Sequence, residues 1–188
     1  VDPDKHKALN EHYYQQYQQG QLDIDQYLSF ALGPMAGMTP ETLSALQDKF
    51  LKKHVEPILL DAAFDLLQAH RVKGDTLIII TATNTLVTQP IADRLGVEYL
   101  IGCEAELKDG RYTGKPEGVP SFGEGKVQRI KAWCAEHQTS LEGAIFYSDS
   151  HNDLPLLREV AQAIAVDPDD LLREEAQQCG WEIISLRP

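Results

Sequence analysis

Hydrophobic positions have helical spacing in the first third of the chain and form short, separate runs in the rest. In the first third, nothing has the polar and apolar alternation of a strand, and the apolar spacing predicts three helices. These helices are expected at 2–20, 22–32 and 39–54. From about residue 59 the pattern changes to apolar runs separated by helical segments. We therefore expect a helical domain over 1–58 and an α/β domain over 59–188.

The second domain alternates strand and helix almost to its end. Strands are expected at 76–80, 97–102, 143–147, 163–166 and 181–186. Helices are expected at 61–74, 85–96, 126–137 and 171–180, with a further helix after Asp153. Asp109-Gly110 is a hairpin signal. Buried strands separated by helices predict a three-layer α/β fold, in which a mostly parallel, doubly wound sheet of Rossmann type has right-handed crossovers.

The composition of the chain disfavours some classes of binding partner. The chain has 188 residues, 43% of them hydrophobic, which is enough to form a core. It has 17 basic and 29 acidic residues, and a net charge of -12 disfavours binding to nucleic acid and to anionic membranes. No apolar run is long enough to span a bilayer and the first residues do not resemble a signal peptide, so we expect a cytoplasmic protein. No pattern indicates an oligomeric state.

Polar residues follow two of the expected strands, where ligands bind in parallel α/β sheets. Thr81 follows the first strand and leads into a helix whose N-terminal amides can hold an anion. Lys126 lies ahead of a later helix, and Asp149 and Asp153 follow the third strand. Carboxylates suit a hard cation, whereas ammonium and amide groups suit phosphate oxygens. The same loops contain four further candidates for binding the substrate, which are Ala82, Thr83, Asn84 and Asn152.

Each of these residues also has a simpler interpretation. Thr81 alone would more often cap the following helix, and Lys126 alone would more often be a solvated surface lysine. Asp149 and Asp153 could be a turn residue and a helix cap. The tyrosines of the first helix fit helix packing better than a substrate pocket. Together, however, the residues occur in the order hydroxyl, lysine and then Asp-x-x-x-Asp. Helix caps and turns explain this order much less easily than they explain each residue alone.

Three segments carry a family resemblance. IIITATN, GEGKVQRI and FYSDSHNDLPLL resemble motifs two, three and four of the haloacid dehalogenase superfamily of phosphatases, closest to the phosphoserine-phosphatase-like branch with a helical cap. The resemblance implies that Thr81 and the Ala82 amide bind a phosphoryl oxygen and that Lys126 neutralises the phosphate and the nucleophile. It also implies that Asp149 ligates Mg²⁺, that Asn152 contacts phosphate, and that Asp153 holds a metal-bound water or orients Lys126. The first three helices would be the cap.

Two features depart from the family pattern. Motif four usually has Gly-Asp-Gly, whereas this chain has Ser148-Asp149-Ser150. Motif one, an Asp-x-Asp-x-Thr segment with the nucleophile and the general acid/base, is not found, and the Asp-Pro-Asp at residues 2–4 follows no strand. The family places the motif-one strand in the middle of the sheet, where its loss would leave backbone groups unpaired. We therefore expect that the sequence is truncated at its amino terminus and is inactive as written.

The resemblance implies a magnesium-dependent phosphomonoester hydrolase of amino-acid metabolism that acts through an aspartyl-phosphate. No arginine lies between residues 1 and 70 to bind a substrate carboxylate, and acidic and tyrosine side chains there suit an amine-bearing phosphate. Glu11 and Tyr14 are candidate substrate contacts, and histidinol phosphate is the favoured substrate. The alternatives are a phosphoserine phosphatase, a non-catalytic magnesium- or phosphate-binding module, and a phosphotransferase or phosphonate lyase of the same superfamily.

Overall fold

The computed structural model of the chain describes residues 3–188, so residue 2, where the first helix was expected to begin, lies outside the described residues. The longer helices are α1 (Pro3–Gln18), α2 (Ile24–Leu32), α3 (Pro40–Phe50), α4 (Asp61–Lys73), α5 (Thr85–Leu95), α6 (Glu124–Glu136) and α8 (Asp170–Cys179). The strands are β1 (Ile78–Asn84), β2 (Tyr99–Lys108), β3 (Arg111–Glu117), β4 (Ile145–Ser148), β5 (Gln162–Val166) and β6 (Glu182–Ile184). None of the described helices is long and apolar enough to cross a membrane.

Short helical segments complete the list of elements. They are the 3-10 helices Gly33–Met35, Glu56–Ile58 and His151–Asp153, the π-helix Leu51–Val55, and the single α-helical turn α7 (Leu154–Leu157). The helix expected after Asp153 is therefore only one turn long. Pro155 lies in its first turn, where the missing amide N–H would have no partner within the helix.

The first three helices are formed as expected, with local caps. The Asp23 carboxylate accepts a hydrogen bond from the Gln26 amide at the start of α2, and the Thr39 hydroxyl accepts one from the Thr42 amide at the start of α3. Leucines of α2 and α3 pack in one apolar cluster with α5 and β2. The cluster consists of Leu28, Leu32, Leu43, Leu86 and Cys103. Helix α1 has no buried residue, and aromatic contacts such as Tyr13 with Tyr27 hold it against α2.

The strands form two three-stranded sheets, in the orders β1-β2-β3 and β4-β5-β6. This differs from the single sheet that the strand and helix alternation predicts. Neighbouring strands are parallel except β2 and β3, which form the expected antiparallel hairpin. Asp109 and Gly110 both have positive φ there, as a tight hairpin turn requires. Strands β1 and β4 are the facing ends of the two sheets and do not pair with each other.

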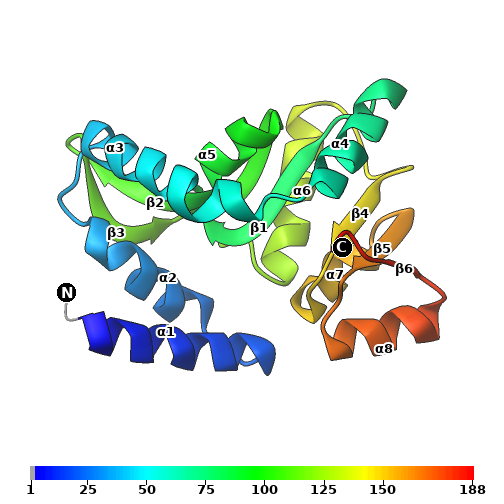
Figure 1. Ribbon diagram of the computed structural model, residues 1–188, viewed down its shortest axis with the longest axis horizontal. Helices are drawn as coiled ribbons and strands as arrows, with labels where there is room; N and C mark the ends of the chain where they lie inside the picture. The colour runs from blue at the N-terminus through cyan, green and yellow to red at the C-terminus, as the bar shows by residue number, and fades with distance from the viewer. Residues whose placement is uncertain (1–2) are drawn as a thin grey trace.

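Helix α6 lies between the two sheets and joins them (Figure 1). Val127, Ile130 and Cys134 of α6 form one buried cluster with Ile101 of β2 and Leu156 of α7. A polar contact also connects the halves, because the buried His70 of α4 contacts the hydroxyl of Tyr147 on β4 through Nε2 at 2.8 Å. The carboxyl ends of β1 and β4 are thereby fixed relative to each other.

Candidate functional site

A cavity of about 440 Å³ lies between α1 and α2 on one side and the carboxyl ends of β1 and β4 on the other. The residues of α1 and α2 and of the turn between them that line it are Asn10, Tyr13, Tyr14, Tyr17, Leu22, Ile24 and Tyr27. The residues of the α/β part that line it are Ile80, Thr81, Ala82, Thr83, Lys126, Phe146, Tyr147, Ser148, Asp149 and Asp153. The cavity therefore brings together most of the residues that the sequence selects.

The cavity faces the open edges of the two sheets. Four consecutive residues of β1, 80–83, line it, and so do four consecutive residues around the end of β4, 146–149. Successive side chains of a strand point to opposite faces, so an unbroken run of lining residues means that the backbone edge itself faces the cavity. The unpaired edges of β1 and β4 thus form two of the cavity walls.

A buried charge pair forms the base of the site. The Lys126 ammonium donates to Asp153 Oδ1 at 2.5 Å, and the Ser148 hydroxyl donates to Asp153 Oδ2 at 2.7 Å. Lys126 is 4% exposed and Asp153 is 8% exposed, so both charges depend on these contacts for compensation. Lys126 is therefore not the solvated surface lysine of the simpler interpretation. Helix α6 carries the ammonium and the motif-four turn carries the carboxylate.

Asp149 is the carboxylate left open to the cavity. Its side chain is exposed, and no residue that the structure describes forms a hydrogen bond or ion pair with its carboxylate, whereas its backbone oxygen accepts from the Asp169 amide at 2.9 Å. Within residues 3–188, no three His, Cys, Asp or Glu side chains are grouped so that they could hold a metal ion. Mg²⁺ in proteins often uses only one or two carboxylates together with substrate phosphate and water. Asp149 fits such a shared site and not a closed protein cage.

The carboxyl end of β1 presents hydroxyls and amides. The strand continues to Asn84, beyond the expected end at residue 80, so Thr81, Ala82 and Thr83 belong to it. The Thr81 hydroxyl accepts a hydrogen bond from the Thr83 amide at 3.1 Å, within the irregular end of β1, and does not cap α5. The cap of α5 is Asn84, whose side-chain oxygen accepts from the Val87 amide, and Asn84 is buried outside the lining of the cavity. Thr81, Ala82 and Thr83 lie at the cavity, whereas Asn84 fixes the start of the helix behind them.

The two serines that replace the usual glycines of motif four are buried and hydrogen-bonded. Ser148 positions Asp153, as described above. The Ser150 hydroxyl accepts from the Asn152 backbone amide at 3.2 Å, from the Asn152 side chain at 3.2 Å, and from the Tyr17 hydroxyl at 2.7 Å. The Asn152 side chain also donates to the backbone oxygen of Tyr17 at 3.1 Å, so it faces α1. Composition and spacing gave no signal for these serine contacts.

Four tyrosines form the helical wall of the cavity. Tyr13, Tyr14, Tyr17 and Tyr27 all line it, so the tyrosines of α1 face the α/β part and do not serve helix packing alone. Burial is the main cause that raises the pKa of Tyr17. The nearby carboxylates of Asp153 and Asp149 raise it further, although the hydrogen bond to Ser150 opposes this. Glu11 is exposed on α1 and does not line the cavity.

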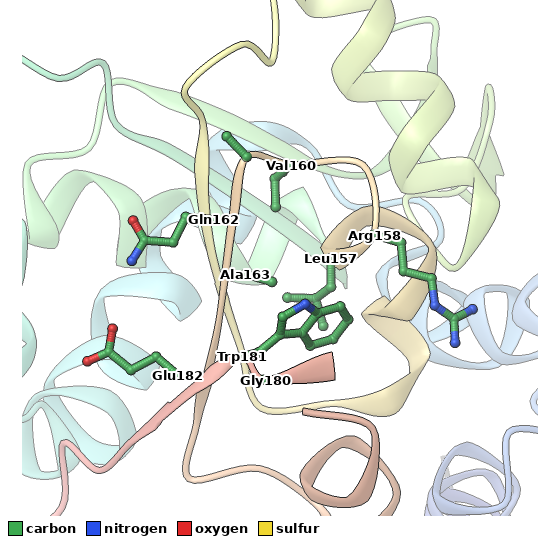
Figure 2. Close-up of a pocket in the computed structure, with 9 residues that line it drawn as sticks. Leu157, Arg158, Val160, Gln162, Ala163, Gly180, Trp181 and Glu182 are labelled. Carbon is green, nitrogen blue, oxygen red and sulfur yellow. The ribbon is translucent and has the colours of Figure 1, made fainter. Parts of the chain in front are cut away.

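A second cavity, of about 450 Å³, lies at the opposite ends of β5 and β6. Figure 2 shows the Trp181 indole beside Leu157, with Arg158 and Glu182 pointing away from each other on opposite sides. The Arg158 guanidinium is paired with Glu175 at 2.7 Å. The charged groups of this cavity diverge, so it lacks the convergent polar set of the first one.

Three known proteins are similar to this chain over most of its length. A histidinol-phosphatase of Neisseria meningitidis is 39% identical over 191 residues, which cover 100% of this chain and 86% of that protein. A phosphoserine phosphatase of Mycobacterium tuberculosis is 34% identical over 157 residues, 84% of this chain and 51% of that protein, so the chain spans only about half of this relative. The crystal structure of a Bordetella pertussis protein of unknown function matches with a TM-score of 0.91 and 41% identity, over 99% of this chain and 85% of that one.

The model of one protein family also matches most of the chain. That family is described as haloacid dehalogenase-like hydrolase, and the match covers residues 2–158, which include all three motif segments. Together with the relatives above, this match shows that the chain belongs to the haloacid dehalogenase-like hydrolase family of phosphatases.

Proposed function

We propose that this protein hydrolyses the phosphate ester of a small amine-bearing metabolite at the cavity between α1 and the carboxyl ends of β1 and β4. One observation carries the proposal. The threonine-containing end of β1, a buried lysine and two carboxylates, which are distant in sequence, surround one cavity of about 440 Å³. Hydroxyl, amide and ammonium donors suit phosphate oxygens, and a free carboxylate suits a divalent cation.

The residues around the cavity divide the work on the phosphate. The Thr81 hydroxyl and the Ala82 amide would donate to phosphoryl oxygens, whereas the Thr83 amide would hold the Thr81 hydroxyl in place through their 3.1 Å contact. The Lys126 ammonium would offset the charge that builds up on phosphate during the reaction. Asp153 would keep that ammonium in place through their 2.5 Å contact. Asn152 would reach phosphate only by giving up its contact with Tyr17, and Asn84 would act indirectly by fixing the start of α5.

Asp149 would hold Mg²⁺ in this proposal. The bound ion would supply charge neutralisation of the phosphate oxygens. Asp153 would act on the same region only through a metal-bound water or through Lys126, since its two oxygens already accept from Lys126 and Ser148. Ser148 would therefore contribute to catalysis by limiting how Asp153 can turn.

The nucleophile we propose is an aspartate on a strand seated between β1 and β4. The support is the pair of open strand edges that line the cavity, because a strand placed there would pair with both edges and join the two sheets into one. Its aspartate would attack phosphorus in line, break the bond to the ester oxygen, and form an aspartyl-phosphate that water then hydrolyses. The given sequence contains no Asp-x-Asp-x-Thr segment that could form such a strand.

The helical wall supports an amine-bearing substrate. All residues of α1 and α2 that line the cavity are neutral, and four of them are tyrosines, Tyr14 among them. No cation there could pair with a substrate carboxylate, whereas aromatic faces attract ammonium and imidazolium groups. The exposed Glu11 on α1 would add long-range attraction for a cation. The name of the Neisseria relative makes histidinol phosphate the first substrate to test.

Phosphoserine is the second candidate, because the Mycobacterium tuberculosis relative is named for it. The test is release of inorganic phosphate from histidinol phosphate, phosphoserine and p-nitrophenyl phosphate, with magnesium or with a chelator. We expect magnesium-dependent turnover, fastest on histidinol phosphate, and loss of about a hundredfold or more in Lys126→Ala. Binding of phosphate without turnover of any ester, in a protein that includes the nucleophile strand, would instead support a non-catalytic module.

A further inference from the structure

We propose that Tyr17 and Ser150 form a clasp that holds α1 over the cavity and so determines how tightly the non-phosphate part of the substrate is enclosed. This inference rests on the proposed function for its substrate. Both residues act here as positioning residues, and neither is required to touch the reacting atoms.

Helix α1 depends on this contact more than the other helices do. It buries no residue of its own, so little apolar area holds it in place. Its contacts with α2 include ring contacts, such as Tyr13 with Phe30 at 5.2 Å between centroids. Its last turn contacts the α/β part, where the Tyr17 hydroxyl donates to Ser150 and the Tyr17 backbone oxygen accepts from Asn152. These two hydrogen bonds join residues 133 and 135 positions apart.

The clasp occupies a position from which it can control the cavity. Tyr17 lines the cavity beside Tyr13 and Tyr14 of the same helix, so movement at Tyr17 moves that part of the wall. Ser150 lies one residue after Asp149 but is 4% exposed and does not line the cavity. Its hydroxyl therefore acts on the substrate through Tyr17. A glycine, the usual residue at this position of the motif, could not make this contact.

The turn after α1 fits the same surface closely. Gly20 has a φ of +66°, and a Cβ added there would lie 3.2 Å from Nε2 of His151. His151 is held from its other side, because its Nδ1 lies 2.8 Å from Asp169 Oδ2. The end of α1 thus rests on a motif-four turn that is itself fixed.

Loss of the clasp should change substrate affinity more than turnover. Without it, α1 would spend part of its time away from the site, and apparent affinity falls with the fraction of molecules that are closed. One hydrogen bond of this kind shifts such an equilibrium by about threefold to tenfold. Once the substrate is bound and the wall is closed, the groups around the phosphate are unchanged. We therefore expect KM to rise and kcat to stay nearly constant.

The test compares Tyr17→Phe, Ser150→Ala and the double variant in the intact protein. Steady-state kinetics with histidinol phosphate should give a higher KM in each single variant, by at most about threefold to tenfold, with kcat within about twofold. The double variant should be no worse than Ser150→Ala alone, because Tyr17→Phe removes only a hydrogen bond that Ser150→Ala has already removed. Tyr99→Phe is the matched control, since it removes a tyrosine hydroxyl from β2, where Tyr99 makes ring contacts with Trp133 and His137.

Hydrogen exchange of the α1 amides gives a second result that does not depend on turnover. Exchange over residues 9–18 should be faster in Tyr17→Phe and Ser150→Ala than in the wild type and in Tyr99→Phe. Additive effects in the double variant, a fall in kcat with KM unchanged, or unchanged exchange in α1 would each overturn the clasp. If the wild type hydrolyses no ester, the proposed function fails, and hydrogen exchange alone decides whether the clasp exists.

Discussion

Replacing Lys126 with methionine should destabilise the protein by about 3 to 5 kcal/mol, because it leaves the Asp153 carboxylate buried without its cation. The side chains of Lys126 and Asp153 are only 6% and 11% exposed, and their charged atoms lie 2.5 Å apart. After the change, the Ser148 hydroxyl is the one side-chain donor to Asp153 that remains among residues 3–188. Methionine has a similar length, so the change removes the charge without leaving a large cavity.

The size of this effect can be judged against the whole fold. Domains of ordinary stability unfold with about 5 to 15 kcal/mol, so the expected loss is a large fraction of the total. A second variant isolates the cause. In Lys126→Met with Asp153→Asn, the buried charge is gone and the amide can still accept from Ser148. We expect this double variant to recover at least about half of the lost free energy.

Urea unfolding in the presence of a chelator, followed by tryptophan fluorescence, measures these differences. Lys131→Met is the matched control, because Lys131 pairs with Glu159 at 2.8 Å but the two side chains are 53% and 43% exposed. That exposed pair should contribute less than about 1 kcal/mol. The reasoning is refuted if Lys126→Met is as stable as Lys131→Met, or if the added Asp153→Asn change destabilises further.

Three further changes test the packing and the charges around the site. Leu28→Ala should lower the free energy of unfolding in urea by about 2 to 5 kcal/mol, because Leu28 is 0% exposed in the cluster that joins α2 to the α/β part. A loss below about 1 kcal/mol would mean that this cluster is not a cooperative core. Gly102→Ala should lower the melting temperature and slow phosphate release together, since its Cβ would lie 2.8 Å from Thr85 Cγ2 and 3.0 Å from the backbone oxygen of Thr83; a variant as stable and active as the wild type would contradict that crowding. The amides of Leu172 and His151 lower the pKa of Asp169 although burial opposes them. The advantage of the wild type over Asp169→Asn in melting temperature should therefore be complete above the unfolded pKa of about 3.9 and vanish as the pH falls through the lower folded pKa. A difference in melting temperature that grows as the pH is lowered would show that the predicted sign of this pH dependence is wrong.

Local patterns predict most of the elements of this fold. The helical spacing before residue 59, the Asp109-Gly110 turn and the apolar runs each depend on neighbours along the chain, and the structure has the expected elements there. The hydrogen bonds between strands do not depend on such neighbours. The separation of β1 from β4 concerns segments about 60 residues apart, and no pattern within either segment indicates it.

The residues of the candidate site also fall into those that the sequence predicts and those that it does not. Thr81, Lys126, Asp149 and Asp153 could be selected because the carboxyl ends of parallel strands meet at one edge and because the motifs are specific. Asn84 was selected with them, but a polar residue at a helix start is as well suited to capping, and that is its position here. The contact between Tyr17 and Ser150 could not be predicted, because it depends on how α1 lies across the motif-four turn.

Phosphate release from histidinol phosphate as a function of magnesium concentration tests the central claim most directly, in a protein that includes the nucleophile strand and in its Asp149→Asn and Asp170→Asn variants. Asp149 lines the cavity and its carboxylate is free for a cation, whereas Asp170 is an equally exposed carboxylate in the first turn of α8. We expect Asp149→Asn to raise the magnesium concentration for half-maximal release by about tenfold or more, and Asp170→Asn to leave it unchanged. Magnesium-dependent release that is the same in all three proteins would contradict the assignment of this cavity as the site of phosphate chemistry.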